Sequence, residues 1–264
     1  MIAETLAVLG GLSLIGVSLR WNWWRLAKAG IPVLMYHKIG IAPKESQQKS
    51  LWVTPERFNW QLNYLKAQGY TAVTFADLKN NSLPVKPVIL TFDDGYLNAY
   101  TDALPILKRH SMRGVFYVVY EAIGRENFWH DSQKEQRIPM MNLENIKTMM
   151  ASGMEMGSHA LTHRRLAAMP LEEAKKEIVE SKQSLEKLLN TEMLSFAFPY
   201  GNGEDVAEIV KISFDAGYRW VLGIHGGIWR VNDSQARPMP RVFVRGDDTK
   251  LDFLLQLRSG RSRL

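Results

Sequence analysis

The chain of 264 residues contains no cysteine. Disulfide bonds and metal sites built on thiolates are therefore excluded. The sequence also lacks internal repeats and low-complexity linkers. At this length a single α/β domain around one core is the default expectation.

The central part of the chain, residues 31–236, has no excess of basic over acidic residues. The formal net charge is +6, but the whole excess lies at the two ends, in residues 1–30 and 237–264. A nucleic-acid reader is expected to spread arginines and aromatic residues along a groove-facing element, and no such stretch is present. We therefore expect no nucleic-acid partner, and the basic ends fit anionic lipid headgroups instead.

Charged residues are absent from residues 5–19, and Trp21, Trp23 and Trp24 follow where an interfacial aromatic belt would lie. A helix of about 15 residues rises about 22 Å, so neighbouring residues would have to extend it across a hydrocarbon core of about 30 Å. Glu4 before the run and the tryptophans after it disfavour a cleaved signal peptide. We expect residues 1–29 to be a single uncleaved membrane anchor, with a buried first helix as the alternative.

Beyond this segment, short apolar runs alternate with stretches of helical periodicity, a pattern typical of βα units and a mostly parallel sheet. The runs expected to be strands are 31–37, 70–75, 87–93, 114–119, 154–159, 194–200 and 219–224. One helix is predicted from the N-cap Thr54 to Gly69. Another is predicted over 171–190, with Glu173 and Glu177 repelling each other on its solvent side. About seven such units fit a closed or nearly closed barrel.

Polar residues gather where the predicted strands end. In α/β barrels the chemistry lies at the carboxyl ends of the strands, so these residues are expected to share one rim. Each taken singly also has a structural explanation, such as a turn for an Asp-Gly pair. The residues concerned are His37, Asp93, Asp94, His159, Tyr200 and Gly201.

His159 and His163 lie four residues apart, so a helical turn there would point both imidazoles the same way. Two imidazoles and one carboxylate make a site with three protein ligands and open positions. Such a site suits zinc, and also iron, cobalt or nickel. One carboxylate of the Asp93–Asp94 pair could bind the cation while the other takes a proton.

The motifs TFDDG (91–95), HALTH (159–163) and FPYG (198–201) stand in this order on strand ends. Together they resemble the motifs of the polysaccharide deacetylases, the NodB-homology carbohydrate esterases. PVLMYHKI (32–39) and MPRVFV (239–244) are similar to the subgroup that opens with a Tyr-His strand and closes on a Pro-Arg strand. The resemblance implies an α/β fold of the deformed (β/α)7 TIM-like type over residues 30–264, here preceded by the N-terminal hydrophobic helix.

The resemblance also implies a role for each matched residue at the metal. Asp94, His159 and His163 would be the ligands of one divalent metal ion, zinc first, with cobalt, nickel or iron as alternatives. Asp93 would be the general base for the attack of a metal-activated water on the amide carbonyl.

The other implied roles fall on three segments. The turn Pro199–Tyr200–Gly201 would contact the substrate, and the backbone N–H of Tyr200 would stabilise the oxyanion. His37 would donate a proton to the leaving amine, and His225 is the alternative general acid.

Departures from the family pattern point to further candidates. Many members carry an arginine two residues before the proline of FPY, where this chain has Ala197. Arg241 of MPRVFV could reach in to orient Asp93 instead, unless it is a surface residue. Trp129 and Trp229 could stack on sugar faces or fill core space.

The sequence therefore predicts a membrane-associated hydrolase that removes N-acyl groups from a polysaccharide or a lipid-linked sugar. An O-acetyl esterase on the same scaffold and a non-catalytic carbohydrate-binding protein are the alternatives. The sugar, the side of the membrane and the oligomeric state stay open.

Overall fold

The computed structural model describes residues 16, 18, 20, 21, 23–133, 135–231 and 237–263. In this part of the chain, eight parallel strands form one sheet, in the order β10-β1-β5-β6-β7-β8-β9 with β4 beside β5. The bounds are β1 Val33–Tyr36, β4 Thr71–Val73, β5 Pro87–Phe92, β6 Val115–Val118, β7 Glu155–Ser158, β8 Ser195–Ala197, β9 Trp220–Leu222 and β10 Val242–Phe243. All seven expected strands are present, and β10 is an eighth.

The strands are buried on both faces, as in other parallel sheets. Alternate residues of a strand point to opposite faces, so each strand contributes to two apolar clusters. Leu90 and Phe92 of β5 belong to the cluster that includes Phe58 and Leu62 of the helix α2, Pro55–Ala67. Ile89 belongs to a second cluster with residues of β1, β4, β6, β8 and β9. The sheet therefore separates a helix-facing core from a core enclosed by its own curvature.

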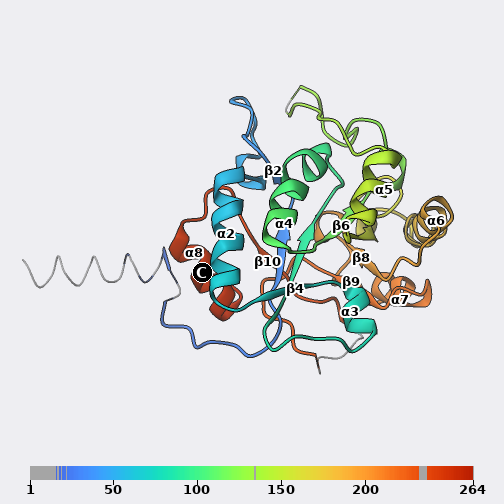
Figure 1. The fold of residues 1–264 in the computed structure, drawn as a ribbon. Helices are drawn as coiled ribbons and strands as arrows, with labels where there is room; N and C mark the ends of the chain where they lie inside the picture. The colour runs from blue at the N-terminus through green and yellow to red at the C-terminus, as the bar shows by residue number, and fades with distance from the viewer. Residues whose placement is uncertain are drawn as a thin grey trace, which may run out of the picture.

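Helices cover the outer face of the sheet (Figure 1). After α2 they are α3 Phe75–Lys79, α4 Leu104–His110, α5 Leu143–Ala151, α6 Leu171–Leu189, α7 Ala207–Asp215 and α8 Lys250–Ser259. The predicted cap of α2 is confirmed, since the Thr54 hydroxyl accepts a hydrogen bond from the Arg57 N–H at 3.3 Å. Shorter elements are β2 Lys38–Ile39, paired with β3 Trp52–Val53, and the helical turns Lys49–Leu51, Ala99–Ala103, Tyr120–Ala122, Leu166–Ala168 and Pro199–Gly201.

The sheet curls until its two edges approach each other. At one edge β10 pairs with β1, and at the other β9 forms a parallel bridge from Leu222 to Met239, which leads into β10. Within the described residues this bridge is what joins the edges. The α/β fold with a curled, half-barrel parallel sheet is thus confirmed, whereas a regular seven-unit barrel would close through a full strand pair.

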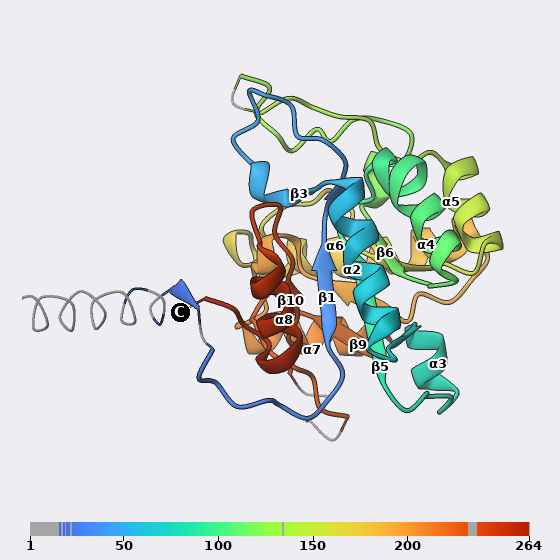
Figure 2. The same cartoon turned by 60° about the vertical axis from the view of Figure 1, so that its left-hand side comes forward.

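Loops gather above the carboxyl ends of the strands (Figure 2). Two of them, residues 40–50 and 124–139, lie side by side in both ribbon views. Glu135 joins them, because its carboxylate accepts hydrogen bonds from the Ser46 hydroxyl at 2.6 Å and from the Gln47 N–H at 2.8 Å. The two loops are therefore held together above the carboxyl ends of the strands.

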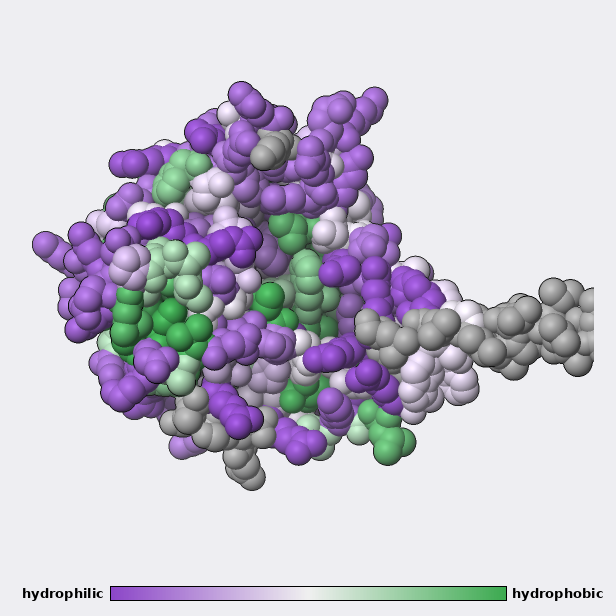
Figure 3. Space-filling model, turned by 180° about the vertical axis from the view of Figure 1, so that it is seen from behind, coloured by the Kyte–Doolittle hydropathy of each residue, from purple (hydrophilic) through white to green (hydrophobic). Residues whose placement is uncertain are grey.

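Most of the predicted anchor, including residues 1–15, lies outside the described residues. Among the residues that are described, no helix has the length and apolar character needed to cross a bilayer. The described part of the predicted anchor contacts the C-terminal helix, since Arg20 forms an ion pair of 2.8 Å with Asp252 of α8. Seen from behind, the folded body has a largely hydrophilic surface with separate apolar areas (Figure 3).

Candidate metal centre

Three potential metal ligands converge at the carboxyl ends of β5 and β7. Asp94 lies just after β5, and His159 and His163 lie on the loop that follows β7. The Nε2 atom of each histidine is 3.1 Å from Oδ1 of Asp94, and all three side chains are buried. One ligand atom from each lies within 4.8 Å of the others, which is close enough for a single ion.

The loop between the two histidines is not the helical turn that the sequence suggested. Ala160 and His163 adopt left-handed backbone conformations, with φ values of 66° and 61°. These two residues bend the chain back on itself, so the two imidazole centroids lie 5.0 Å apart. The two rings therefore both face Asp94, as expected, but a helical turn is not the backbone conformation that brings them there.

Glu177 of α6 holds this loop in place. Its carboxylate accepts hydrogen bonds from the N–H of Leu161 at 3.1 Å and of Thr162 at 2.9 Å, and from the Thr162 hydroxyl. The prediction that Glu177 faces solvent is wrong, because its side chain is only 5% exposed. A charged residue in a helix is ordinarily expected to face solvent, so no sequence pattern indicates the contact between Glu177 and this loop.

The donor set is held in place by hydrogen bonds and by mutual charge interactions. The Nδ1–H of His159 donates to the carbonyl of Ala197 at 2.7 Å, which turns Nε2 toward Asp94. Burial lowers the pKa of His163, although Asp94 acts in the opposite sense. Burial alone would raise the pKa of Asp94, but His163 and the hydrogen bonds from both histidines hold it well below its usual range. An ionised carboxylate beside two imidazole nitrogens is a donor set that fits a divalent metal ion.

Asp93 does not join this set and faces an arginine instead. Arg241 donates from Nη1 and Nη2 to the two carboxylate oxygens of Asp93, at 2.7 and 2.8 Å. The guanidinium is fully buried, and its Nε donates to the carbonyl of Gly223 at 2.8 Å. Burial would raise the pKa of Asp93, but Arg241, together with His159 and His37, outweighs this and lowers it. Asp93 is therefore an ionised side chain beside the candidate metal ligands.

The two candidate general acids lie in different surroundings. His37 is half-buried at the end of β1, and burial lowers its pKa while Asp94 and Asp93 act to raise it. Its Nδ1 atom is buried and has no hydrogen-bond partner among the described residues. His225 is 60% exposed and pairs with Glu204 at 3.0 Å. Asp94 and Asp93 thus act on the pKa of His37, whereas the contacts of His225 are with Glu204 and Asp205.

Two aromatic rings flank His163. Trp129 stacks on it with a centroid distance of 4.2 Å, and Tyr200 meets it edge-on at 4.6 Å. Pro199 and Gly201 are buried, and Tyr200 between them is 40% exposed with a φ of 58°. The predicted turn therefore borders the metal centre.

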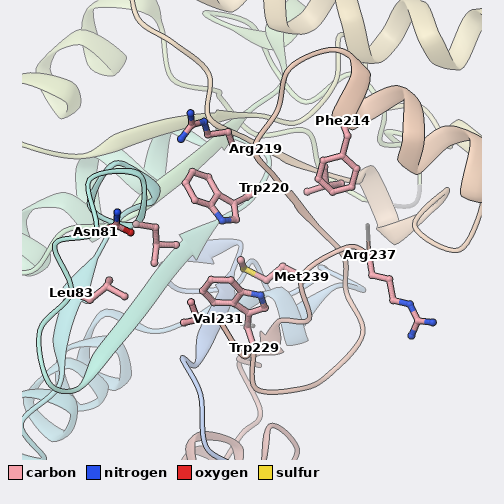
Figure 4. Close-up of a pocket in the computed structure, with 11 residues that line it drawn as sticks. Asn81, Leu83, Phe214, Arg219, Trp220, Trp229, Val231, Arg237 and Met239 are labelled. Atoms are coloured by element: carbon pink, nitrogen blue, oxygen red, sulfur yellow. The ribbon is translucent and has the colours of Figure 1, made fainter. Parts of the chain in front are cut away.

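Trp229 lies at the opposite end of the sheet. It bridges Ile31, which precedes β1, and with Trp220 it lines a cavity of 190 Å³ at the amino ends of the strands (Figure 4). The suggestion that Trp229 stacks on a sugar at the rim of the site is therefore wrong. Lys38, whose burial no sequence pattern indicates, is 1% exposed beside the site, with Nζ 4.6 Å from the ring centroid of Tyr96.

Comparison with known proteins places this geometry in a family. The family model described as polysaccharide deacetylase matches residues 80–221. YxkH of Bacillus subtilis, named for the same family, is 28% identical over 75% of this chain and 66% of its own length. The poly-beta-1,6-N-acetyl-D-glucosamine N-deacetylase of Escherichia coli is 23% identical over 86% of this chain. The chain covers less than two thirds of these two relatives, and only 38% of the second.

Solved structures agree with the sequence comparison. The deacetylase PplD of Streptococcus pyogenes, solved with acetate, has a TM-score of 0.73 and 27% identity, covering 88% of this chain and 99% of that one. IcaB from Ammonifex degensii has a TM-score of 0.71 and 26% identity, covering 88% and 97%. Since the family model matches more than half of the sequence and the curled sheet is shared, the chain belongs to the polysaccharide deacetylase family.

Proposed function

We propose that this protein removes N-acetyl groups from a polysaccharide or a lipid-linked sugar by metal-dependent hydrolysis. The observation that carries the proposal is the convergence of Asp94, His159 and His163 beside an ionised Asp93. The names of the E. coli and S. pyogenes relatives, an N-deacetylase and a deacetylase, support the same reaction class.

Asp94, His159 and His163 would hold one divalent ion, and zinc suits their composition best, with cobalt, nickel or iron as alternatives. Such an ion supplies Lewis-acid polarisation of the acyl carbonyl and lowers the pKa of water toward neutrality. The three side chains are buried and constrained by neighbouring groups, so little reorganisation is needed to bind it. That preorganisation supports metal binding at this place.

Asp93 would accept the proton of the attacking water. Arg241 holds its carboxylate in one orientation through two hydrogen bonds and keeps it ionised. A base fixed in this way contributes about 10² to 10⁴ in rate when it lies within reach of the proton.

His37 would return a proton to the nitrogen of the leaving amine. Its Nδ1 has no hydrogen-bond partner among the described residues, and Asp93 and Asp94 act on its pKa, which supports this role for His37 over His225. The backbone N–H of Tyr200, in the turn between Pro199 and Gly201, would donate to the oxygen of the tetrahedral intermediate.

Replacement of Asp93 by Asn tests the proposal. We expect the zinc-loaded variant to lose acetate release from N-acetylglucosamine oligomers by at least about 10²-fold while it retains one equivalent of zinc. Asp215→Asn, at an exposed position on α7, is the matched control and should keep both activity and zinc. Full activity in the Asp93 variant would disprove the assignment of the base.

Two other functions give different results in the same assays. An O-acetyl esterase would release acetate from acetylated xylan faster than from N-acetylglucosamine oligomers. A non-catalytic carbohydrate-binding protein would bind glycan after chelation and would turn over neither substrate with any metal.

We also propose that residues 1–29 attach the protein to a membrane. Support comes from the uncharged run of residues 5–19 and from Trp23 and Trp24, which are 50% and 45% exposed beside the folded body. Fractionation after an alkaline wash tests this proposal, and recovery of the full chain in the soluble fraction would contradict a spanning anchor.

A further inference from the structure

A pocket of 610 Å³ opens beside the candidate metal ligand His163. Its walls combine aromatic, apolar and basic side chains, and none of the lining residues is an aspartate or a glutamate. The lining residues are Phe128, Trp129, Thr162, His163, Arg164, Arg165, Ala168, Met169 and Tyr200. The ionic groups in the lining are therefore basic, and they come from Arg164 and Arg165.

The aromatic residues connect this pocket to the reacting centre. Trp129 and Tyr200 line the pocket and also contact the ring of His163, at centroid distances of 4.2 and 4.6 Å. Flat aromatic surfaces with a few placed polar groups are typical of sites that bind small organic ligands. A group bound in the pocket would thus lie next to the sugar whose acyl group reaches the metal.

The two arginines differ in whether a carboxylate already pairs with the guanidinium. Arg164 forms an ion pair of 3.1 Å with Glu173 of α6. Arg165 lies over the ring of Tyr200, with Cζ 4.3 Å from the centroid, and has no ion pair to a carboxylate within the described chain. Stacking on an aromatic face orients a guanidinium and leaves the N–H donors in its plane available for an anion.

We propose that this pocket binds an anionic group, a phosphate or a carboxylate, carried by the glycan unit next to the sugar that is deacetylated. Arg165 is the principal partner of the anion, and Trp129 and Tyr200 hold the sugar that carries it. The inference rests on the proposed function, because it names the substrate class of the same site. A polymer of N-acetylglucosamine alone carries no negative charge, so the two substrate classes can be separated by experiment.

Three oligosaccharides of equal length test the inference on the zinc-loaded full chain. One is a neutral N-acetylglucosamine oligomer, and the other two carry a phosphate monoester or a carboxylate on one unit. We expect a KM about fivefold lower for an anionic probe than for the neutral one, an advantage that shrinks at high salt. Lower KM for the phosphate probe than for the carboxylate probe would identify phosphate as the group, and the reverse order would identify carboxylate.

Variants assign the effect to the arginines. Arg165→Gln should abolish the difference in KM between the anionic and neutral probes. Glu173→Gln frees Arg164 and should enlarge that difference. Arg109→Gln, at an exposed position on α4 outside the pocket lining, is the matched control and should leave it unchanged.

The failure of this inference differs from the failure of the proposed function. Equal KM values for all three probes in the wild-type protein, or a preference that survives Arg165→Gln, would overturn the anionic subsite while acetate release continued. Absence of acetate release from every probe would instead count against the hydrolase. Calorimetric binding of the phosphate probe to Asp93→Asn, with and without Arg165→Gln, would still decide the subsite, and equal affinities would overturn it.

Discussion

Arg241 donates hydrogen bonds to both carboxylate oxygens of Asp93, which lies 148 positions earlier in the sequence. The side chains of this pair are almost completely buried. Removal of one partner of a buried ion pair leaves the other charge buried without compensation, which is strongly destabilising. The pair therefore fixes the orientation of Asp93 and also makes the folded state depend on it.

Removal of one partner should be costly for stability. We expect Arg241→Met to lower the free energy of unfolding by about 3–5 kcal/mol, because it leaves the buried Asp93 carboxylate without its countercharge. Urea denaturation followed by circular dichroism measures this loss. The double variant Asp93→Asn/Arg241→Met should recover part of it, whereas additive losses would show that the pair is not coupled. Arg109→Met serves as the surface control and should cost less than about 0.5 kcal/mol.

Glu177 should control metal affinity without being a ligand. Glu177→Leu removes the acceptor for two N–H groups and one hydroxyl in the loop between the histidines, so we expect zinc to bind about 10- to 100-fold more weakly. Glu177→Gln keeps an oxygen that can accept both N–H groups and should retain most of the affinity.

Competition with a chromophoric chelator measures zinc binding in both Glu177 variants. Glu180→Leu, at an exposed position one turn later on α6, is the matched control. Wild-type zinc affinity in Glu177→Leu would mean that the loop holds its shape without this carboxylate.

Glu155 should make stability depend on pH. It begins β7, accepts a hydrogen bond from the Ala76 N–H at 2.8 Å, and burial raises its pKa to about 7. The folded state then holds a proton that the unfolded state releases at its ordinary, lower pKa. The contribution to stability is complete below the unfolded pKa and is lost as the pH rises through about 7.

We expect the free energy of unfolding to fall by about 3 kcal/mol from this group between pH 4.5 and pH 7, since each unit of pKa difference corresponds to about 1.4 kcal/mol. Urea titrations of the wild-type protein and of Glu155→Gln across this range measure it, and the variant should show a flatter profile. Glu144→Gln, exposed on α5, should behave as the wild type. Identical profiles for the wild type and Glu155→Gln would rule out this residue as the source.

Glu135 should keep the two loops above the site together. Glu135→Ala removes the acceptor for the Ser46 hydroxyl and the Gln47 N–H, so both groups lose a charge-assisted hydrogen bond. We expect faster proteolytic cleavage within residues 124–139 and little change in the global unfolding midpoint. Glu126→Ala, exposed on the same loop, is the control. Unchanged cleavage would show that the loops are held by other contacts.

The strands and the clustering of Asp94, His159 and His163 could be predicted from sequence because both follow from local patterns. Apolar runs locate the strands, and polar motifs at their ends meet at one edge of a parallel sheet. The ion partner of Asp93 could be suggested only through the missing arginine at Ala197, since no local pattern joins Arg241 to a carboxylate far away in the chain.

Other features had no local signature at all. Glu177 occupies a position of α6 that charge alone assigns to solvent, and only the tertiary contact with the histidine loop makes it buried. Trp229 follows two glycines, as residues of loops at the carboxyl ends of strands often do. It nevertheless forms a bridge with Ile31, at the amino ends of the strands. In both cases packing between distant segments decided the position, and residue type did not.

The left-handed backbone conformation of His163 and Ala160 limits how the thermal stability of this protein can be increased. An L-residue in that conformation carries a penalty of about 1 kcal/mol that glycine avoids. At His163 the relief would delete an imidazole, so the strain there is inseparable from the chemistry. Ala160 is not a candidate ligand, but its methyl group is fully buried in the core, so Ala160→Gly would exchange backbone strain for lost packing. Neither position of this loop can therefore be relaxed without a loss elsewhere.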